Sequence, residues 1–421
     1  MVMSSKIFKY ASLLLAAVML VSCTGTVDPE DANNGTDTGI EGGNDNGNDN
    51  GSDEGNDEPL VPKELILSVN KNFVQTFGGD YIQLTVELGD MTLCDPETVT
   101  FYDESDNVIT IENFRFRTEK SGEQKFYANY GTYFSNEVTV TGIDVPIPTL
   151  PEDYYQDNLS FMPRVLLTQF TTTGCTYCPL MKKRLKEALD EEYTKKVVKV
   201  DCHNGIINKR NDPAYVHLPD FGDGNYPKVY FDMYLEGHNN NLQSSSDVHA
   251  IIDELYDYKE GRAVGIAVAS NASEDQIVTN VLVKAAEEGQ YRIGVMLLED
   301  NIVASAAQTQ QGTGVEDWMN THNSCIRYMD AGSKYLGHSL GTLKKGETAD
   351  YVFVFNLTDI WDKGMLKAEQ NYSTWAKTWV AENLHLAIFV TTTTEDGYSS
   401  YVSNVVDCSI NETRPFEFTN I

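Results

Sequence analysis

The stretch FTTTGCTYCPLM, residues 170–181, contains two cysteines separated by two residues and follows the apolar run VLLTQF at 165–170. The run predicts a buried strand, and the apolar spacing that continues from Met181 predicts a helix. Cys175 is then expected in the first turn of that helix, where unpaired N–H groups and the helix dipole favour a thiolate. Cys178 is expected one turn further on, close enough to resolve a mixed disulfide formed at Cys175.

The segments that follow alternate between strand and helix patterns. Residues 197–202 (VVKVDC) predict a second strand, and residues 228–237 (KVYFDMYLEG) predict two more strands joined by a turn. Residues 247–258 predict a closing helix with Asp247 as its N-cap. This order indicates a small α/β unit with a right-handed crossover over residues 161–260.

Strand patterns flank this unit on both sides. Residues 63–143 alternate apolar and polar positions between turn residues, which predicts an immunoglobulin-like β-sandwich. Residues 144–160 are rich in proline and predict a linker. Strands return over 261–421 and predict a C-terminal β-sandwich, with a long insertion at 302–346 between its third and fourth strands. We therefore expect a multi-domain protein with a central α/β domain flanked by two β-sandwich domains.

The N-terminus has the pattern of a secretory signal. Lys6 and Lys9 precede an apolar stretch at 11–21 that is too short to span a bilayer. The following LVSC resembles the lipobox of bacterial lipoproteins, and the resemblance implies that residues 1–22 are removed and that Cys23 receives lipid. The alternative is an ordinary signal peptide that happens to contain a cysteine. Lipidation would anchor the protein to a membrane.

Residues 23–62 predict a disordered acidic tether. The segment contains GNDNGNDNGSDEGNDE at 43–58 and has no Lys or Arg beyond Cys23. Such a composition buries too little apolar surface to offset the entropy of ordering. Calcium loops are the alternative, but the irregular Asp spacing lacks their ligand register. The net charge of −32 over the whole chain argues against a nucleic-acid partner.

A proline about fifty residues beyond the cysteines completes a recognisable pattern. The order of strand, CxxC, helix, strand and the Tyr226-Pro227 step into the next strand resembles the thioredoxin superfamily. The resemblance implies a cis bond at Pro227, facing the cysteines, beside which an extended thiol substrate binds. Cys175 is then the nucleophile, Cys178 the resolving thiol and Pro227 part of the catalytic clamp.

The same resemblance makes Thr176, Tyr177 and Tyr226 the expected substrate-binding residues. One departure concerns the first strand, where the family often has a buried carboxylate that assists proton transfer. This chain has Gln169 there, which cannot act as a general base.

Other roles for the cysteines stay open. A zinc site would need Cys175, Cys178 and Cys202 with His203, but neighbours on a strand point to opposite faces, so we expect no metal and no cofactor. A permanent structural disulfide between Cys175 and Cys178 is the stronger alternative in an oxidising compartment. Another disulfide between Cys325 and Cys408 is conceivable, and the sequence does not decide it.

The order of lipobox, tether, immunoglobulin-like module, TGCTYCP unit and C-terminal β domain resembles the outer-membrane lipoprotein family known as Omp-twenty-eight-like. Two hypotheses follow for the function. The first is a lipid-anchored protein, facing the periplasm or the exterior, that exchanges disulfides with a protein partner. The second is a non-catalytic cell-surface binding or scaffold lipoprotein in which the cysteine pair is structural.

Overall fold

The structure is a computed structural model that describes residues 64–89, 93–203, 212–216, 218, 226–332, 335–361, 380–394 and 399–421. The predicted signal peptide, the acidic tether and Cys23 lie outside these residues. Within the described part, strands dominate; α2 (Cys178–Ala188) and α3 (Ser245–Lys259) are α-helices, and residues 357–361 are helical as well.

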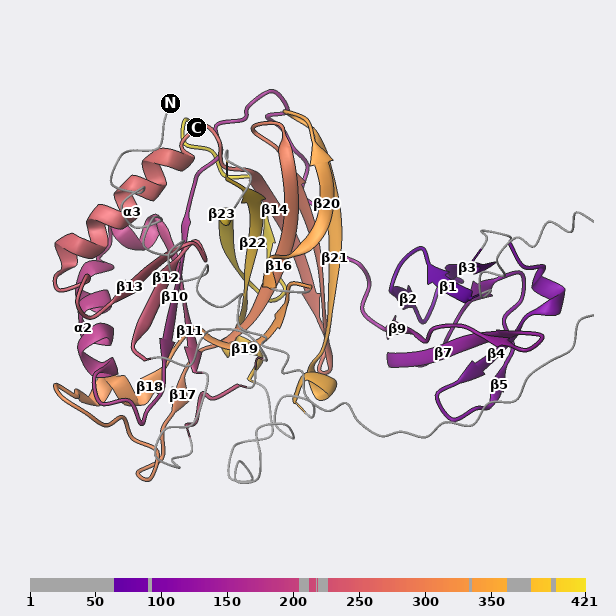
Figure 1. Cartoon of the computed structure of the whole chain (residues 1–421). Coiled ribbons are helices and arrows are strands. Elements are labelled where there is room, and N and C mark those ends of the chain that lie inside the picture. Colours follow the sequence, from indigo (N-terminus) through magenta and orange to yellow (C-terminus); the bar gives the residue numbers. More distant parts are fainter. Residues whose placement is uncertain are drawn as a thin grey trace, which may run out of the picture.

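The N-terminal part, at the right of Figure 1, consists of two sheets that enclose one apolar core. The three-stranded sheet has the order β1 (Leu65–Val69), β3 (Ile82–Leu88), β6 (Arg115–Phe116). The six-stranded sheet has the order β2 (Phe73–Gln75), β9 (Val138–Ile143), β7 (Gly122–Tyr130), β4 (Thr100–Asp103), β5 (Val108–Ile109), with β8 (Tyr133–Phe134) beside β7. In β3 every second residue is buried, as the alternation IQLTVEL predicts. Phe116 and Phe126 stack at 4.7 Å between ring centroids and join the two sheets.

The rest of the chain is built on a nine-stranded sheet. Its order is β13 (Leu235–His238), β12 (Lys228–Phe231), β10 (Val165–Thr171), β11 (Val197–His203), β19 (Cys325–Asp330), β16 (Gly289–Glu299), β22 (Leu384–Thr393), β23 (Ser400–Ser409), with β20 (His338–Leu343) beside β16. Strands β10 and β11 are parallel, and β12 and β13 form the predicted hairpin. The junction is β19, which pairs with β11 through Asp201 and Cys325 and with β16 along most of its length.

This continuous sheet overturns the predicted fold class. The expected central α/β domain does not stand alone, because its four strands and the C-terminal strands belong to the same hydrogen-bonded sheet. The protein is therefore rich in β-sheet, and helices α2 and α3 lie on one side of one sheet. The stretch predicted to be an insertion at 302–346 contains β19, the strand that joins the two halves.

Four layers follow one another across this body, as Figure 1 shows. Helices α2 and α3 cover the outer face of β10 to β13. The inner faces of β10 and β11 share a core with β19, β22 and β23, so the sheet curves back on itself. The far side of β16, β22 and β23 packs on a four-stranded sheet with the order β21 (Thr348–Asn356), β15 (Gln276–Lys284), β14 (Gly265–Ala272), β24 (Thr413–Arg414). The remaining pair is β17 (Ile302–Val303) with β18 (Thr321–His322).

Polar contacts fix the helices on the sheet. The N-cap of α3 is Ser244 rather than the predicted Asp247, which sits three residues later and completes a capping box with Ser244. At the other end of α3, Lys259 Nζ lies 2.7 Å from the buried Asp232 carboxylate. Helix α2 buries Met181, Lys182, Leu185 and Ala188, so a lysine lies within its apolar stripe.

Candidate functional site

The cysteine pair lies between β10 and α2. Strand β10 is buried throughout, and the chain turns after it so that the Cys175 N–H donates to the Thr172 carbonyl at 3.1 Å. Cys175 and Cys178 form a disulfide. Helix α2 begins at Cys178, so Cys175 lies in the turn before the helix and not, as predicted, in its first turn. The Cys178 N–H points at Cys175 Sγ, 3.1 Å away.

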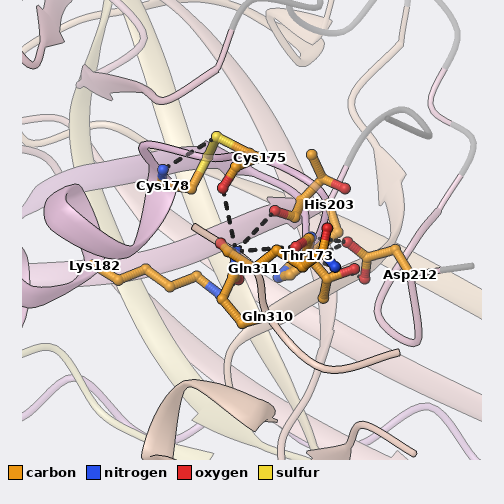
Figure 2. Close-up of a disulfide and its surroundings, with 9 residues drawn as sticks. Thr173, Cys175, Cys178, Lys182, His203, Asp212, Gln310 and Gln311 are labelled. Atoms are coloured by element: carbon orange, nitrogen blue, oxygen red, sulfur yellow. Dashed lines mark hydrogen bonds and ion pairs between the residues drawn. A yellow bond between two sulfur atoms is a disulfide. The ribbon is translucent and has the colours of Figure 1, made fainter. Parts of the chain in front are cut away.

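A distant segment covers this disulfide. The Gln311 N–H donates to the Thr173 carbonyl at 2.9 Å, and the Thr313 N–H donates to the Thr176 carbonyl at 3.1 Å. Gln310 Nε2 adds a bond to the Thr173 carbonyl at 3.2 Å and lies within 3.5 Å of the Cys175 carbonyl. We call residues 308–314 the covering segment. Figure 2 shows Gln310 and Gln311 beside the cysteine pair.

The two sulfurs lie in a buried turn whose backbone is bonded to the covering segment. Cys175 is 4% exposed and Cys178 is fully buried, although Thr176 and Tyr177 between them are exposed. Close approach requires Gly312, whose φ is +116°, because a Cβ there would lie 2.1 Å from the Thr176 carbonyl oxygen. The disulfide is thus buried, and the turn that contains it is held by backbone hydrogen bonds to a segment that is distant in sequence.

A buried pair, His203 and Asp212, is hydrogen-bonded to the cysteine turn. Asp212 accepts from the Thr173 N–H at 2.8 Å, and its carboxylate lies 2.9 Å from His203 Nδ1 (Figure 2). Burial alone would raise the pKa of Asp212, but the His203 imidazole and the hydrogen bonds hold it well below its usual range. Both side chains are fully buried. Asp212 therefore ties the end of β11 to the residues that precede Cys175.

Lys182 and His322 lie next to His203 and Asp212, and we call these four buried residues the polar layer. Lys182 Nζ lies 3.3 Å from Gln310 Oε1 and 3.5 Å from His322 Nδ1. Burial lowers the pKa of Lys182, and burial together with the Lys182 amine lowers the pKa of His322 well below its ordinary value. His322 is therefore a neutral imidazole near pH 7. Its ring meets that of His203 edge to face, with 4.8 Å between the ring centroids.

The predicted proline step lies at the same end of the sheet. The Tyr226-Pro227 bond is cis, as the resemblance implies. Lys228 pairs with Phe170 across β12 and β10, so Pro227 is level with the point where β10 runs into the cysteine turn. Tyr226 packs against the core that contains Phe170. The structure thus brings Cys175, Cys178 and Pro227 to one end of the sheet, without a described contact between the proline and the sulfurs.

Three further cysteines of the described part lie outside any disulfide. They are Cys202, Cys325 and Cys408, which are all buried, so the conceivable Cys325–Cys408 bond is absent. Among the described residues there is no group of three or more His, Cys, Asp and Glu side chains placed to hold a metal ion. In the same part of the chain, no helix has the length and apolar character needed to cross a membrane.

Sequence reasoning identified the cysteines but missed their surroundings. Lys182 could have been noticed, because it occupies a position of the apolar stripe of α2. Gly312, Gln310 and His322 lie in the stretch that was taken for an insertion, and no local pattern connects them to Cys175. Asp212 carries no sequence signal that we can identify.

No family model matches the chain, and no curated protein matches it either. Among solved structures, HBP35 of Porphyromonas gingivalis is 15% identical, with a TM-score of 0.44, over 62% of this chain and 79% of that chain. Domains 4–9 of the surface layer protein SbsC are 9% identical, with a TM-score of 0.16, over 84% of this chain and 68% of that chain. At these values neither structure assigns a family or an activity to this protein. The resemblance to the Omp-twenty-eight-like family stays a prediction.

Proposed function

We propose that the protein is a lipid-anchored binding or scaffold protein of the bacterial cell envelope, in which the Cys175–Cys178 disulfide is a structural crosslink. The observation that carries this proposal is the enclosure of the disulfide by the covering segment. Exchange requires a thiolate to attack one sulfur along the S–S axis while the other sulfur leaves, and an attacking protein must reach that sulfur. With Cys175 4% exposed and Cys178 buried, no such approach exists in this conformation.

The residue beneath the cysteines supports the same proposal. Gln169 is fully buried on β10 and has an amide where proton transfer would need a titratable group. The titratable groups nearby are otherwise engaged, since Asp212 is paired with His203 and Lys182 contacts Gln310 and His322. A buried, polar and hydrogen-bonded surround of this kind stabilises one arrangement of the turn.

The envelope location in this proposal rests on the N-terminal sequence. Lys6, Lys9, the short apolar stretch and LVSC form a lipoprotein signal, with Cys23 as the lipidated residue, all of it outside the described residues. The acidic segment after Cys23 would hold the β-rich body away from the membrane, facing either the periplasm or the exterior. The partner would then meet the folded body rather than the lipid.

Turnover of a model disulfide tests the structural role. The full-length chain is added to insulin and dithiothreitol, and insulin reduction is followed by its precipitation. We expect the rate to equal that measured with the Cys175→Ala/Cys178→Ala variant, which serves as the matched control. A rate increase that depends on both cysteines would overturn the proposal.

Thiol-disulfide exchange is the second candidate, and one observation favours it. Pro227 lies level with the end of β10, at the same end of the sheet as the disulfide, and Thr176 and Tyr177 are exposed beside it. Exchange would require the covering segment to leave Thr173 and Thr176 first. A Cys178→Ser variant distinguishes the candidates, since only an exchanging protein accumulates mixed disulfides at Cys175.

A further inference from the structure

A cavity of about 490 Å³ lies beside Lys182 and His322. Its walls come from β10, α2, β11 and the segment that runs from the short helix Asp317–Asn320 into β18. The residues that matter for its chemistry are Gln169, Lys182, Lys186, Lys199, Trp318 and His322. The volume is in the range of sites that hold small organic ligands.

Two buried side chains in this cavity have polar atoms without partners. Gln169 is fully buried, and neither its Nε2 nor its Oε1 has a hydrogen-bond partner. His322 is 3% exposed, and its Nε2 is also unpartnered. A protonated Lys182 amine can only donate, so its contact with His322 Nδ1 leaves the hydrogen of the neutral imidazole on Nε2. A buried polar atom that lacks a partner is destabilising, so such atoms mark a place for a ligand or water.

Positively charged side chains predominate in the lining of the cavity, whereas the protein as a whole is strongly acidic. Three lysines line it against one carboxylate, Asp201, which is already paired with Lys199. The chain as a whole has a net charge of −32. A local excess of positive charge in so acidic a protein selects an anionic ligand.

The other wall of the cavity is apolar. The Trp318 ring lies under Lys186, with 4.0 Å from Nζ to the ring centroid, and its indole N–H is already bonded to Glu316. One face of the ring is therefore occupied by the Lys186 amine, and an apolar group can lie only along the part of the Trp318 ring that Lys186 leaves uncovered. Leu189 and Met319 extend this surface.

We propose that this cavity binds a small organic carboxylate that has a hydroxyl or amino group beside the carboxylate and an apolar tail. The carboxylate accepts from Lys182 Nζ, His322 Nε2 and Gln169 Nε2. The neighbouring hydroxyl or amino group donates to Gln169 Oε1, and the tail lies along Trp318. This inference goes beyond the proposed function and does not depend on the inertness of the disulfide.

Calorimetric titration with three related probes tests the ligand chemistry. Phenyllactate has the carboxylate, the hydroxyl and the tail, whereas phenylpropionate lacks the hydroxyl and phenylpropanol also lacks the carboxylate. We expect phenyllactate to bind more tightly than phenylpropionate, and phenylpropanol to bind most weakly. Absence of binding by phenyllactate up to about 10 mM, or equal binding of all three probes, would overturn the proposal.

Substitutions in the full-length chain test the assigned residues. Gln169→Leu removes the unpartnered amide, so we expect phenyllactate binding to weaken by about tenfold or more while the melting temperature stays equal or rises. Lys186→Met removes the positive charge of one of the three lysines that line the cavity, so it should weaken phenyllactate binding too. Lys183→Met should not weaken binding, because Lys183 is on the same helix but lies outside the cavity and pairs with Glu316. If phenyllactate binds the Gln169→Leu variant and the Lys186→Met variant as tightly as the wild type, the proposed binding site is wrong. The reduction rate of the disulfide, measured on the same samples, reports separately on the proposed function.

Discussion

The Gln311 N–H donates to the Thr173 carbonyl at 2.9 Å, which fastens a segment between β17 and β18 over the turn that contains Cys175. The two residues are far apart in sequence, and the contact is made entirely by backbone atoms. It is one of several hydrogen bonds between the covering segment and the backbone around the two cysteines. The access of any partner to the disulfide therefore depends on a part of the chain outside the cysteine motif.

Gly312→Ala should open the covering segment. The new Cβ would overlap the Thr176 carbonyl oxygen at 2.1 Å, so the segment must move away. We expect the disulfide to be reduced by dithiothreitol about tenfold faster or more, as followed by alkylation and mass spectrometry. Gly314→Ala is the matched control, because that glycine also has a positive φ but its Cβ would meet only Leu180 Cδ2 at 3.4 Å. Equal rates in the two variants would show that the segment does not guard the disulfide.

Removing the crosslink should lower stability modestly. The disulfide closes a loop of very few residues, for which the chain-entropy model gives about 2 kcal/mol. Cys175→Ala/Cys178→Ala is therefore expected to lower the free energy of unfolding by about that amount, measured in urea. No loss of stability would contradict the structural role proposed for the pair.

Lys259→Met should lower the free energy of unfolding more than removal of the disulfide does. Lys259 Nζ lies 2.7 Å from Asp232 and donates to the Arg164 carbonyl at 2.7 Å, with both charged side chains buried. The substitution leaves a buried carboxylate unpaired, which costs about 3–5 kcal/mol. The double variant Lys259→Met/Asp232→Asn removes the stranded charge and should recover part of the loss. A double variant less stable than Lys259→Met would refute this explanation.

His385 should make stability fall at alkaline pH. Burial alone would lower the pKa of His385, but Asp300 and Asp407 raise it to about 9. Because the folded pKa lies above the ordinary value of 6.5, the stabilisation is complete below about pH 6.5 and is lost as the pH rises through about 9. The loss is on the order of 2 kcal/mol, allowing for screening of the partly exposed carboxylates. Urea unfolding of wild type and His385→Gln checks this, since only the wild type should lose stability over that interval.

Cys23→Ser should release the protein from the membrane. If Cys23 carries the lipid, the variant will not incorporate labelled palmitate and will move from the membrane to the soluble fraction. Membrane association that persists in the variant, with label still incorporated, would exclude Cys23 as the lipidated residue.

Local patterns in the sequence predicted the elements but not how they join. The buried run at 165–170, the hairpin at 228–237 and the alternation at 82–88 each appear where expected, because each pattern reflects burial on its own strand. The fold class was wrong because of β19. That strand buries Arg327, which pairs with Glu299, and a charged residue inside an apolar run hides the strand pattern.

In the candidate site, too, the sequence predicted the local feature but not the contacts between distant segments. Cys175 and Cys178 are close in sequence, so their spacing alone predicts that they can pair. Apart from the Gln310 side chain, the covering segment meets the cysteine turn through backbone groups and a glycine, which leave no complementary side-chain signal in either stretch. Only the three-dimensional arrangement connects Gly312 with Thr176.

The reduction rate of the Cys175–Cys178 disulfide in the folded chain shows whether the fold protects this bond. Full-length protein is treated with dithiothreitol with and without denaturant, and new thiols are counted by alkylation and mass spectrometry. We predict reduction at least about 100-fold slower in the folded chain than in the unfolded chain. If the folded chain is reduced as fast as the unfolded one, the disulfide is not protected and its proposed structural role is wrong.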